Sequence, residues 1–325
     1  MAATLSAPIF VVGCPRSGTT LLQYILRAHP RISMATGESH FIIPLSRRLA
    51  EFGDLASPDG QRQILAAMEA QSRSFLETDL HGLQYDRERF VARFQELGVS
   101  TFAALIDALF MENARGEGKV RWADKTPWYV LHMGRLLELF PGARFVHLIR
   151  DGRDVALSLF RRRHDFLVYN TYCAARYWEL YVERGREIGS RLPSGTYKEF
   201  YYEQLIQQPK DFLRELCVFL GEEYTDALLD YKRAGEVGRE TGKGKIPERL
   251  EAKTPLLKGD IVASNHGKWE REFSEGQRQV FERAVGDLLH SHGYAVKYPQ
   301  RPIPLVIKAA YRGHNRLAQW LSKRP

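Results

Sequence analysis

The segment VVGCPRSGTTLLQ, residues 11–23, combines glycines, hydroxyls and an arginine at the spacing of a phosphate-binding loop. Gly13 is followed by four residues and then by Gly18 and two threonines. Loops that bind nucleoside triphosphates place a lysine after the second glycine, where it reaches the β- and γ-phosphates. Here Thr19 occupies that position. The pattern therefore predicts a backbone anion site for a single 5′-phosphate, with Arg16 contacting a group attached to that phosphate.

A second pair of candidate anion-binding residues follows the apolar run FVHLI. Arg150 ends this run, and Ser158 lies eight residues later in a helix predicted from Gly152. Asp151 is expected to cap this helix, and Asp154 to answer it in a capping box. Taken singly, an ordinary ion pair and a packing hydroxyl explain these residues equally well. Ligands of open α/β sheets bind at the carboxyl ends of the strands, where both Arg150 and the glycine loop are predicted.

Strand-like and helix-like segments alternate along the chain. The predicted strands are PIFVVG, RISMATGE, KVRWAD, ARFVHLIR and TYKEFYYE. The predicted helices between and after them are TTLLQYILRAHP, PWYVLHMGRLLELFPG, a helix from Gly152, TYCAARYWELYVERGREI and LIQQPKDFLRELCVFLG. This alternation predicts one α/β domain over residues 1–325, with three layers around a parallel sheet and a P-loop-type strand, loop and helix at its start.

Three segments depart from this alternation. Residues 41–118 are helical and polar, and they predict a helical insertion of a size suited to a substrate lid. Residues 235–255 are glycine-rich and basic without an apolar period, as in a mobile or ligand-binding loop. Residues 299–325 form a basic, amphipathic tail, which either packs on the body or makes weak contact with a membrane surface.

The net charge favours a protein that binds anions, and the cysteine content favours a reducing compartment. The net charge of +8 suits an anionic ligand, although a solvated basic surface has the same charge. The three cysteines are too scattered for a disulfide framework or a zinc site, and Cys14 is interpreted as a small packing residue. The start of the chain has no basic export signal, and no apolar stretch approaches the roughly 20 residues of a membrane helix. We therefore expect a cytoplasmic location.

Several of these segments resemble sulfotransferases that use 3′-phosphoadenosine 5′-phosphosulfate, especially bacterial and protein-tyrosine types. PRSGTT resembles the family's 5′-phosphosulfate loop, and the Arg150-to-Ser158 spacing resembles its 3′-phosphate motif. YYEQLIQQPKDFLRELCVFLG resembles the next strand and helix, in which Tyr202 matches a tyrosine near the adenine. KWEREFSEGQRQVFE, with Trp269, resembles the closing segment. Together the matches span about residues 8–294.

The resemblance implies a metal-free transfer of a sulfuryl group to an acceptor hydroxyl, with adenosine 3′,5′-bisphosphate as the second product. The residues that it implies for donor binding are Arg16, Ser17, Gly18, Thr19, Thr20, Arg150, Ser158, Tyr202 and Lys268. By analogy with phosphoryl transfer, the transition state is loose and in line, so positioning and charge stabilisation supply most of the catalysis.

The same resemblance implies a set of catalytic residues. Arg16, or Lys125 in WADKTP, supplies the cation for the departing 5′-phosphate. Glu38 in TGESHFIIP matches the glutamate base of the protein-tyrosine members, and His40 is the alternative base.

One family feature is missing from this sequence. Small-molecule sulfotransferases carry an Arg-Lys-Gly segment for the 3′-phosphate before the final tryptophan, whereas this chain has IVASNHGKW. Either Ser264, Asn265 and Lys268, or the basic residues 239–245, take over that contact.

Two other function classes remain open. A Mg-ATP kinase would need a lysine at position 19 and a strand-end aspartate, for which Asp124 is the available residue. A nucleic-acid-binding protein would need basic residues interleaved with aromatics, as in LFRRRHDF. The acceptor is also open among small molecules, sugars, lipids and peptide tyrosines, and we expect residues 41–118 to select it.

Overall fold

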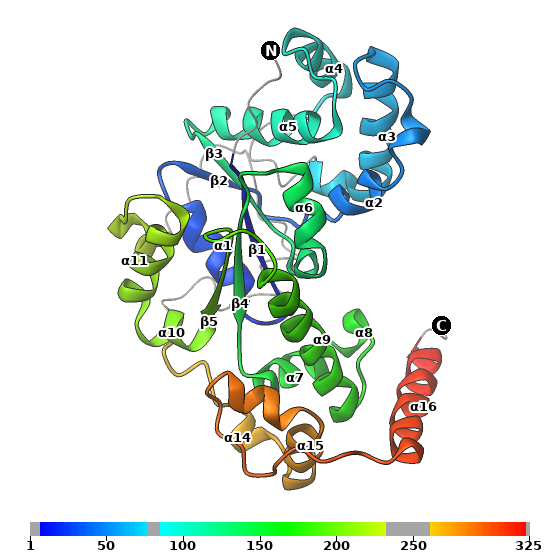
Figure 1. Ribbon diagram of the computed structural model, residues 1–325, viewed down its shortest axis with the longest axis vertical. Helices are drawn as coiled ribbons and strands as arrows, with labels where there is room; N and C mark the ends of the chain where they lie inside the picture. Colours follow the sequence, from blue (N-terminus) through cyan, green and yellow to red (C-terminus); the bar gives the residue numbers. More distant parts are fainter. Residues whose placement is uncertain (1–6, 77–84, 232–260, 323–325) are drawn as a thin grey trace.

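The computed structural model describes residues 7–76, 85–231 and 261–322 of the chain. Within them, five strands form one sheet in the order β2-β3-β1-β4-β5, and every pair of neighbours is parallel (Figure 1). The strands are β1 (Ile9–Gly13), β2 (Ile32–Met34), β3 (Arg121–Lys125), β4 (Arg144–Ile149) and β5 (Tyr197–Tyr201). The predicted parallel α/β fold is therefore confirmed.

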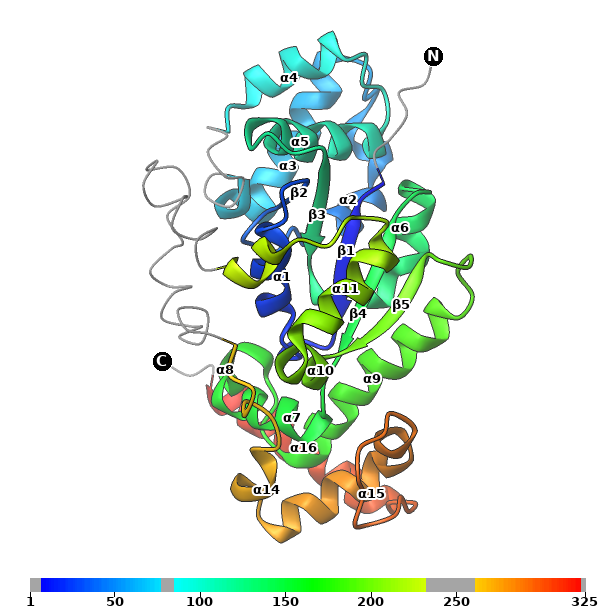
Figure 2. The same cartoon turned by 90° about the vertical axis from the view of Figure 1, so that its left-hand side faces the viewer.

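Helices cover both faces of the sheet. β1 contributes side chains to both cores because successive side chains of a strand point to opposite sides. Phe10 and Val12 join a core with α6, α7 and α9, whereas Ile9 and Val11 join a second core with α1 and α11. Figure 2 shows α1 and α11 on one side of the strands. All five residues of β1 are buried, as a short apolar run without polar alternation predicts.

The helices fall into three groups along the chain. The layers on the sheet contain α1 (Thr19–Arg27), η3 (Pro127–His132), α6 (Met133–Leu139), α7 (Gly152–Arg161), α8 (Arg163–Phe166), α9 (Thr171–Gly189), α10 (Tyr202–Gln207), α11 (Pro209–Leu220) and η4 (Asp226–Asp230). The insertion contains α2 (Ile42–Ser46), η1 (Leu49–Phe52), α3 (Pro58–Ser74), α4 (Arg87–Glu96) and α5 (Phe102–Gly116). The C-terminal part contains α14 (Trp269–Glu272), α15 (Glu275–Ser291) and α16 (Leu305–Ser322).

The insertion between β2 and β3 is helical, as its pattern predicts, and it packs on the sheet through aromatic contacts. The ring of Phe110 in α5 stacks on that of Trp122 in β3, with centroids 4.5 Å apart. At the end of α3, Ser72 Oγ donates to the carbonyl of Ser39 at 3.2 Å. The insertion therefore touches the segment that contains the predicted base.

Several element boundaries differ from the sequence predictions. The second strand is only three residues long, and the helix predicted from Pro127 starts as a 3₁₀ turn. The single helix predicted over LIQQPKDFLRELCVFLG is split into α10 and α11. Pro209 has no N–H and disfavours helical geometry at Gln208, whose φ is −134°, so a new helix starts at the proline.

The C-terminal helices close the carboxyl side of the sheet. Helix α14 packs on α7, and α15 packs on α9. The buried Arg153 connects them, because it pairs with Asp151 and Glu282 at 2.7 Å and stacks on the Trp269 ring at 3.6 Å. None of the helices in the described ranges is long and apolar enough to cross a membrane.

Candidate active site

The glycine loop joins β1 to α1 in a conformation that its two glycines make possible. Gly13 has φ +146°, and a Cβ at that position would lie 2.5 Å from the carbonyl oxygen of Leu148 in β4. Gly18 has φ +92°, and a Cβ there would lie 2.2 Å from the ring of Tyr202. Larger residues at either position would both strain the backbone and collide with β4 or Tyr202.

The start of α1 has the features of an anion site. Gly18 occupies the N-cap position without a side chain to cap the first N–H groups, so these donors face the loop. Ser17 Oγ is fully buried and has no hydrogen-bond partner in the part of the chain that the structure describes, and Thr19 is also buried. A buried hydroxyl without a partner is costly, which indicates that a ligand completes this loop.

Arg16 links the glycine loop to the second predicted motif. Its Nε donates to Ser158 Oγ at 2.9 Å, although 142 positions separate the two residues. Burial and the neighbouring cations Arg162 and Arg150 lower the pKa of the Arg16 guanidinium. The backbone of Arg16 adopts φ +77°, which is uncommon for a side-chain-bearing residue. Mutually repelling cations held together in this way suit a polyanionic ligand.

Arg150 lies at the end of β4, between Tyr202 and the C-terminal segment. Its guanidinium stands 4.4 Å from the centre of the Tyr202 ring, and Nη2 donates to the carbonyl of Asn265 at 2.9 Å. Asn265 in turn donates to the Tyr202 hydroxyl at 2.7 Å. The Nε of Arg150 is buried and has no hydrogen-bond partner among the described residues, so this donor is a candidate contact for a ligand.

The capping box predicted for α7 is wrong in one of its two parts. Asp151 does cap the helix, since its side chain accepts from the Arg153 N–H. Asp154 does not reach back, because the Asp151 N–H donates to Glu203. Instead Asp154 accepts from the backbone N–H groups of Gly267 and Trp269 at 2.8 and 3.1 Å.

This use of Asp154 fixes the segment that contains the predicted donor-binding residue Lys268. The two amides held by Asp154 flank Lys268, and the same carboxylate lies 3.5 Å from Arg150. Of the predicted substitutes, Asn265 contacts Arg150 directly, whereas Ser264 is exposed. The alternative basic segment, residues 239–245, lies outside the described residues.

Three of the four predicted catalytic residues, Glu38, His40 and Lys125, form a charged triplet at the ends of β2 and β3, whereas Arg16 lies in the glycine loop. Lys125 Nζ donates to Glu38 Oε1 at 2.5 Å, and His40 Nε2 lies 2.9 Å from Glu38 Oε2. Lys125 is buried, whereas about a third of the Glu38 side chain is exposed. The carboxylate therefore bridges the Lys125 ammonium and the His40 imidazole and keeps an open side.

The pKa values of Glu38 and His40 are shifted in opposite directions. Burial raises the pKa of Glu38, but Lys125 and His40 outweigh it and lower that pKa to about 2. The hydrogen bond to Glu38 raises the pKa of His40 despite its partial burial. Glu38 is therefore ionised and able to accept a proton at neutral pH, while His40 is biased towards its proton-donating form.

In two further residues near the loop, Cys14 and Asp124, burial is the main cause of a raised pKa. Burial raises the pKa of the Cys14 thiol well above its usual value, which agrees with its interpretation as a packing residue. Burial also raises the pKa of Asp124 to about 6. No cluster of three or more histidine, cysteine, aspartate or glutamate side chains suited to a metal occurs in the described part of the chain.

All of these groups gather at one edge of the sheet. Because the strands are parallel, their carboxyl ends share that edge. In spatial order across it come Glu38 after β2, Lys125 in β3, the glycine loop after β1, Arg150 after β4 and Tyr202 after β5. Sequence reasoning missed the role of Asp154 as a holder of the segment before α14, since 113 positions separate it from Gly267 and no local pattern marks the contact.

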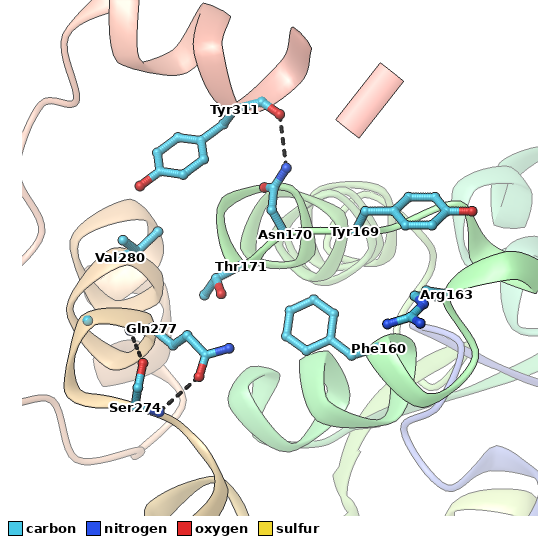
Figure 3. Close-up of a pocket in the computed structure, with 10 residues that line it drawn as sticks. Phe160, Arg163, Tyr169, Asn170, Thr171, Ser274, Gln277, Val280 and Tyr311 are labelled. Atoms are coloured by element: carbon cyan, nitrogen blue, oxygen red, sulfur yellow. Dashed lines mark hydrogen bonds between the residues drawn. The ribbon is translucent and has the colours of Figure 1, made fainter. Parts of the chain in front are cut away.

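A separate cavity of about 670 Å³ lies between α7, α9, α15 and α16. Figure 3 shows Phe160, Thr171, Val280 and Tyr311 around it. None of the predicted site residues lines this cavity.

Comparison with known protein families identifies the family whose members share this sequence pattern. The model described as "Sulfotransferase family" matches residues 8–226, which include the glycine loop, the Glu38 segment, Lys125 and Arg150. The chain belongs to the sulfotransferase family.

Curated relatives agree with this assignment. The chain is 28% identical over 276 residues to the protein-tyrosine sulfotransferase of Drosophila melanogaster, covering 78% of this chain and 48% of that protein. It is 28% identical over 228 residues to a putative protein-tyrosine sulfotransferase of Caenorhabditis briggsae, covering 69% and 68%. This sulfotransferase-family chain thus spans about half the length of the fly relative.

Solved structures show the same fold. The sulfotransferase domain of the Synechococcus PCC 7002 olefin synthase aligns with a TM-score of 0.59 at 21% identity, over 91% of this chain and 98% of that one. The sulfotransferase domain from the curacin biosynthetic pathway aligns with a TM-score of 0.57 at 20% identity, over 90% and 100%.

Proposed function

We propose that this protein transfers the sulfuryl group of 3′-phosphoadenosine 5′-phosphosulfate to an acceptor hydroxyl. The observation that carries the proposal is that a phosphate loop without its lysine meets the Glu38–Lys125 pair at one edge of the sheet. Family membership supports the same reaction. The donor supplies an activated sulfate on one 5′-phosphate, which suits a loop that has Thr19 in place of a triphosphate-reaching lysine.

The unpaired donors of the site fit this nucleotide. The uncapped start of α1 and Ser17 Oγ would hold the 5′-phosphosulfate. Arg150, whose Nε has no partner among the described residues, and Ser158 would hold the 3′-phosphate. Tyr202 would lie near the adenine, and Lys268 would approach from the segment held by Asp154.

The charged triplet would carry out the transfer. Glu38 accepts the proton of the acceptor hydroxyl while the new O–S bond forms and the S–O bond to the 5′-phosphate breaks. A carboxylate of low pKa is a weak base, so this proton moves late, after the acceptor oxygen has lost electron density to sulfur. Lys125 and Arg16 supply positive charge to the departing phosphate oxygen. No step in this scheme assigns a role to a metal ion.

A transfer assay with ³⁵S-labelled donor tests the proposal. We would screen tyrosyl peptides, simple phenols, sugars and lipid alcohols as acceptors, with and without EDTA. Transfer to at least one hydroxyl class at an unchanged rate in EDTA is the expected result. Calorimetry should show that adenosine 3′,5′-bisphosphate binds more tightly than ATP. Mg²⁺-dependent phosphate transfer from ATP, without sulfate transfer, would favour a kinase instead.

A further inference from the structure

The C-terminal helix α16 is amphipathic, but its apolar side faces away from the protein. Leu305, Val306, Leu317 and Leu321 are 81%, 80%, 56% and 53% exposed. At 100° per residue these four side chains fall on one side of the helix, together with Trp320. Figure 1 shows α16 at the periphery of the molecule. A helix that only covered the protein would turn this side inward.

The opposite, polar side of α16 attaches the helix to the loop before α9. Asn315 is the buried residue of the helix; its side chain accepts from the Tyr169 N–H and donates to the Leu167 carbonyl, at 2.7 and 3.0 Å. Gln319 donates to the same carbonyl at 2.8 Å. The Tyr311 ring stacks on Tyr172 with centroids 5.2 Å apart. These contacts hold the helix in one orientation, with its leucines outward.

The charge around the outward side has a single sign. Residues 299–325 contain six lysines and arginines and no aspartate or glutamate. Arg312 and Arg316 are exposed and lie one turn apart, beside the apolar stripe. An apolar stripe bordered by cations matches a surface with anionic groups above hydrocarbon.

We propose that α16 docks this protein on the surface of an anionic lipid bilayer. The leucine side enters the boundary between head groups and acyl chains, and Arg312 and Arg316 contact the phosphates. The helix lies along the surface, since its polar side stays attached to the protein and it is not apolar enough to cross a membrane. A second copy of the chain is a poorer occupant, because two such helices would bring like charges together. The inference is independent of the proposed catalytic function.

Vesicle flotation with the full chain tests the proposal. Vesicles of phosphatidylcholine and phosphatidylglycerol in equal parts should bind the protein, vesicles of phosphatidylcholine alone should bind it at least tenfold less, and salt should weaken binding. The double variant Leu317→Gln/Leu321→Gln should bind at least tenfold less than the wild type. Val218→Gln, which removes an exposed apolar residue from α11, is the matched control and should bind normally.

The charge contribution is tested separately. Arg312→Gln/Arg316→Gln should lose binding to the anionic vesicles, whereas Arg89→Gln/Arg191→Gln, with the same net charge and exposed sites elsewhere, should retain it. Circular dichroism melts check that each variant is folded. Wild-type protein that ignores anionic vesicles would overturn the proposal. So would a dimer in sedimentation that Leu317→Gln/Leu321→Gln dissociates, because a second copy would then cover the stripe.

Discussion

Two neighbouring side chains, Glu38 and His40, show how local electrostatics assign chemical roles that residue type leaves open. Histidine is the more frequent base in proteins because its ordinary pKa lies near neutrality. Here the pKa of His40 is raised by its hydrogen bond to Glu38, while that of Glu38 is lowered to about 2 despite burial. At neutral pH Glu38 is therefore ionised, which supports the proposal that Glu38 is the base and that His40 orients it.

Replacing Glu38 should remove catalysis and leave donor binding intact. Glu38→Gln keeps the shape but cannot accept a proton, so kcat should fall by about 10²–10⁴. His40→Ala should cost less, because Lys125 still holds the carboxylate. Steady-state kinetics measure both effects, and calorimetry with adenosine 3′,5′-bisphosphate should give wild-type affinity for Glu38→Gln. Normal kcat in Glu38→Gln together with an inactive His40→Ala would reverse the two roles.

Arg150 should discriminate nucleotides by their 3′-phosphate. Arg150→Ala removes a buried cation whose Nε has no partner in the described part of the chain, so the affinity for adenosine 3′,5′-bisphosphate should fall by about ten- to a hundredfold. The affinity for adenosine 5′-phosphate, which lacks the 3′-group, should change little. Arg161→Ala on the outer side of α7, where Arg161 pairs with Glu272, is the control. Equal losses for the two nucleotides would count against the assignment.

At the scale of elements, strand ends were predictable and long-range partners were not. The run PIFVVG predicted β1, and the order strand, loop and helix placed Gly18 before α1. The acidic pattern after Arg150 predicted the cap by Asp151 but assigned Asp154 to a local partner. A tertiary contact sets the position of the Asp154 side chain, because it accepts from the amides of Gly267 and Trp269 at the start of α14. The split at Pro209 follows from the missing N–H of proline, a local feature that the sequence itself contains.

The packing of the loop against β4 and α10 predicts different consequences for its two glycines. Gly13→Ala and Gly18→Ala should each lower the free energy of unfolding by about 1–3 kcal/mol through positive φ and close contact. Tyr202→Leu should recover part of the loss in Gly18→Ala, because a flexible side chain replaces the ring that the new Cβ meets. It should recover nothing in Gly13→Ala, whose new Cβ meets the Leu148 backbone. Urea unfolding of the single and double variants measures this difference, and equal recovery in both would show that the contact with Tyr202 is unimportant.

At the scale of the whole molecule, a partly buried polar network joins the sheet to the helices that cover it. His147 in β4 contacts the Tyr197 hydroxyl of β5 at 2.7 Å, and Tyr197 donates to Glu199 at 2.9 Å. Arg186 of α9 pairs with Glu199 at 2.8 Å and reaches His292 after α15 at 3.2 Å. β4, β5, α9 and the end of α15 therefore share one set of hydrogen bonds, and a charge added there affects global unfolding.

Acid should destabilise this protein through His147 and His292. Burial lowers the pKa of both to about 4, and Arg186 contributes in each case. Unfolded histidines titrate near 6.5, so between pH 6.5 and 4 the unfolded chain binds more protons than the folded one. The free energy of unfolding should therefore fall as the pH drops through this window, by roughly 3 kcal/mol for His147.

Urea titrations at several pH values measure this dependence. In His147→Gln the free energy of unfolding should start lower at pH 7, because the contact with Tyr197 is altered, and should then fall less steeply towards pH 4. His290→Gln, at an exposed position of α15, is the control and should retain the wild-type slope. The uncharged amide removes the proton-binding group while keeping a polar side chain at the site. A wild-type slope in His147→Gln would show that this imidazole does not take up a proton on unfolding, and the acid sensitivity would then have to originate elsewhere in the network.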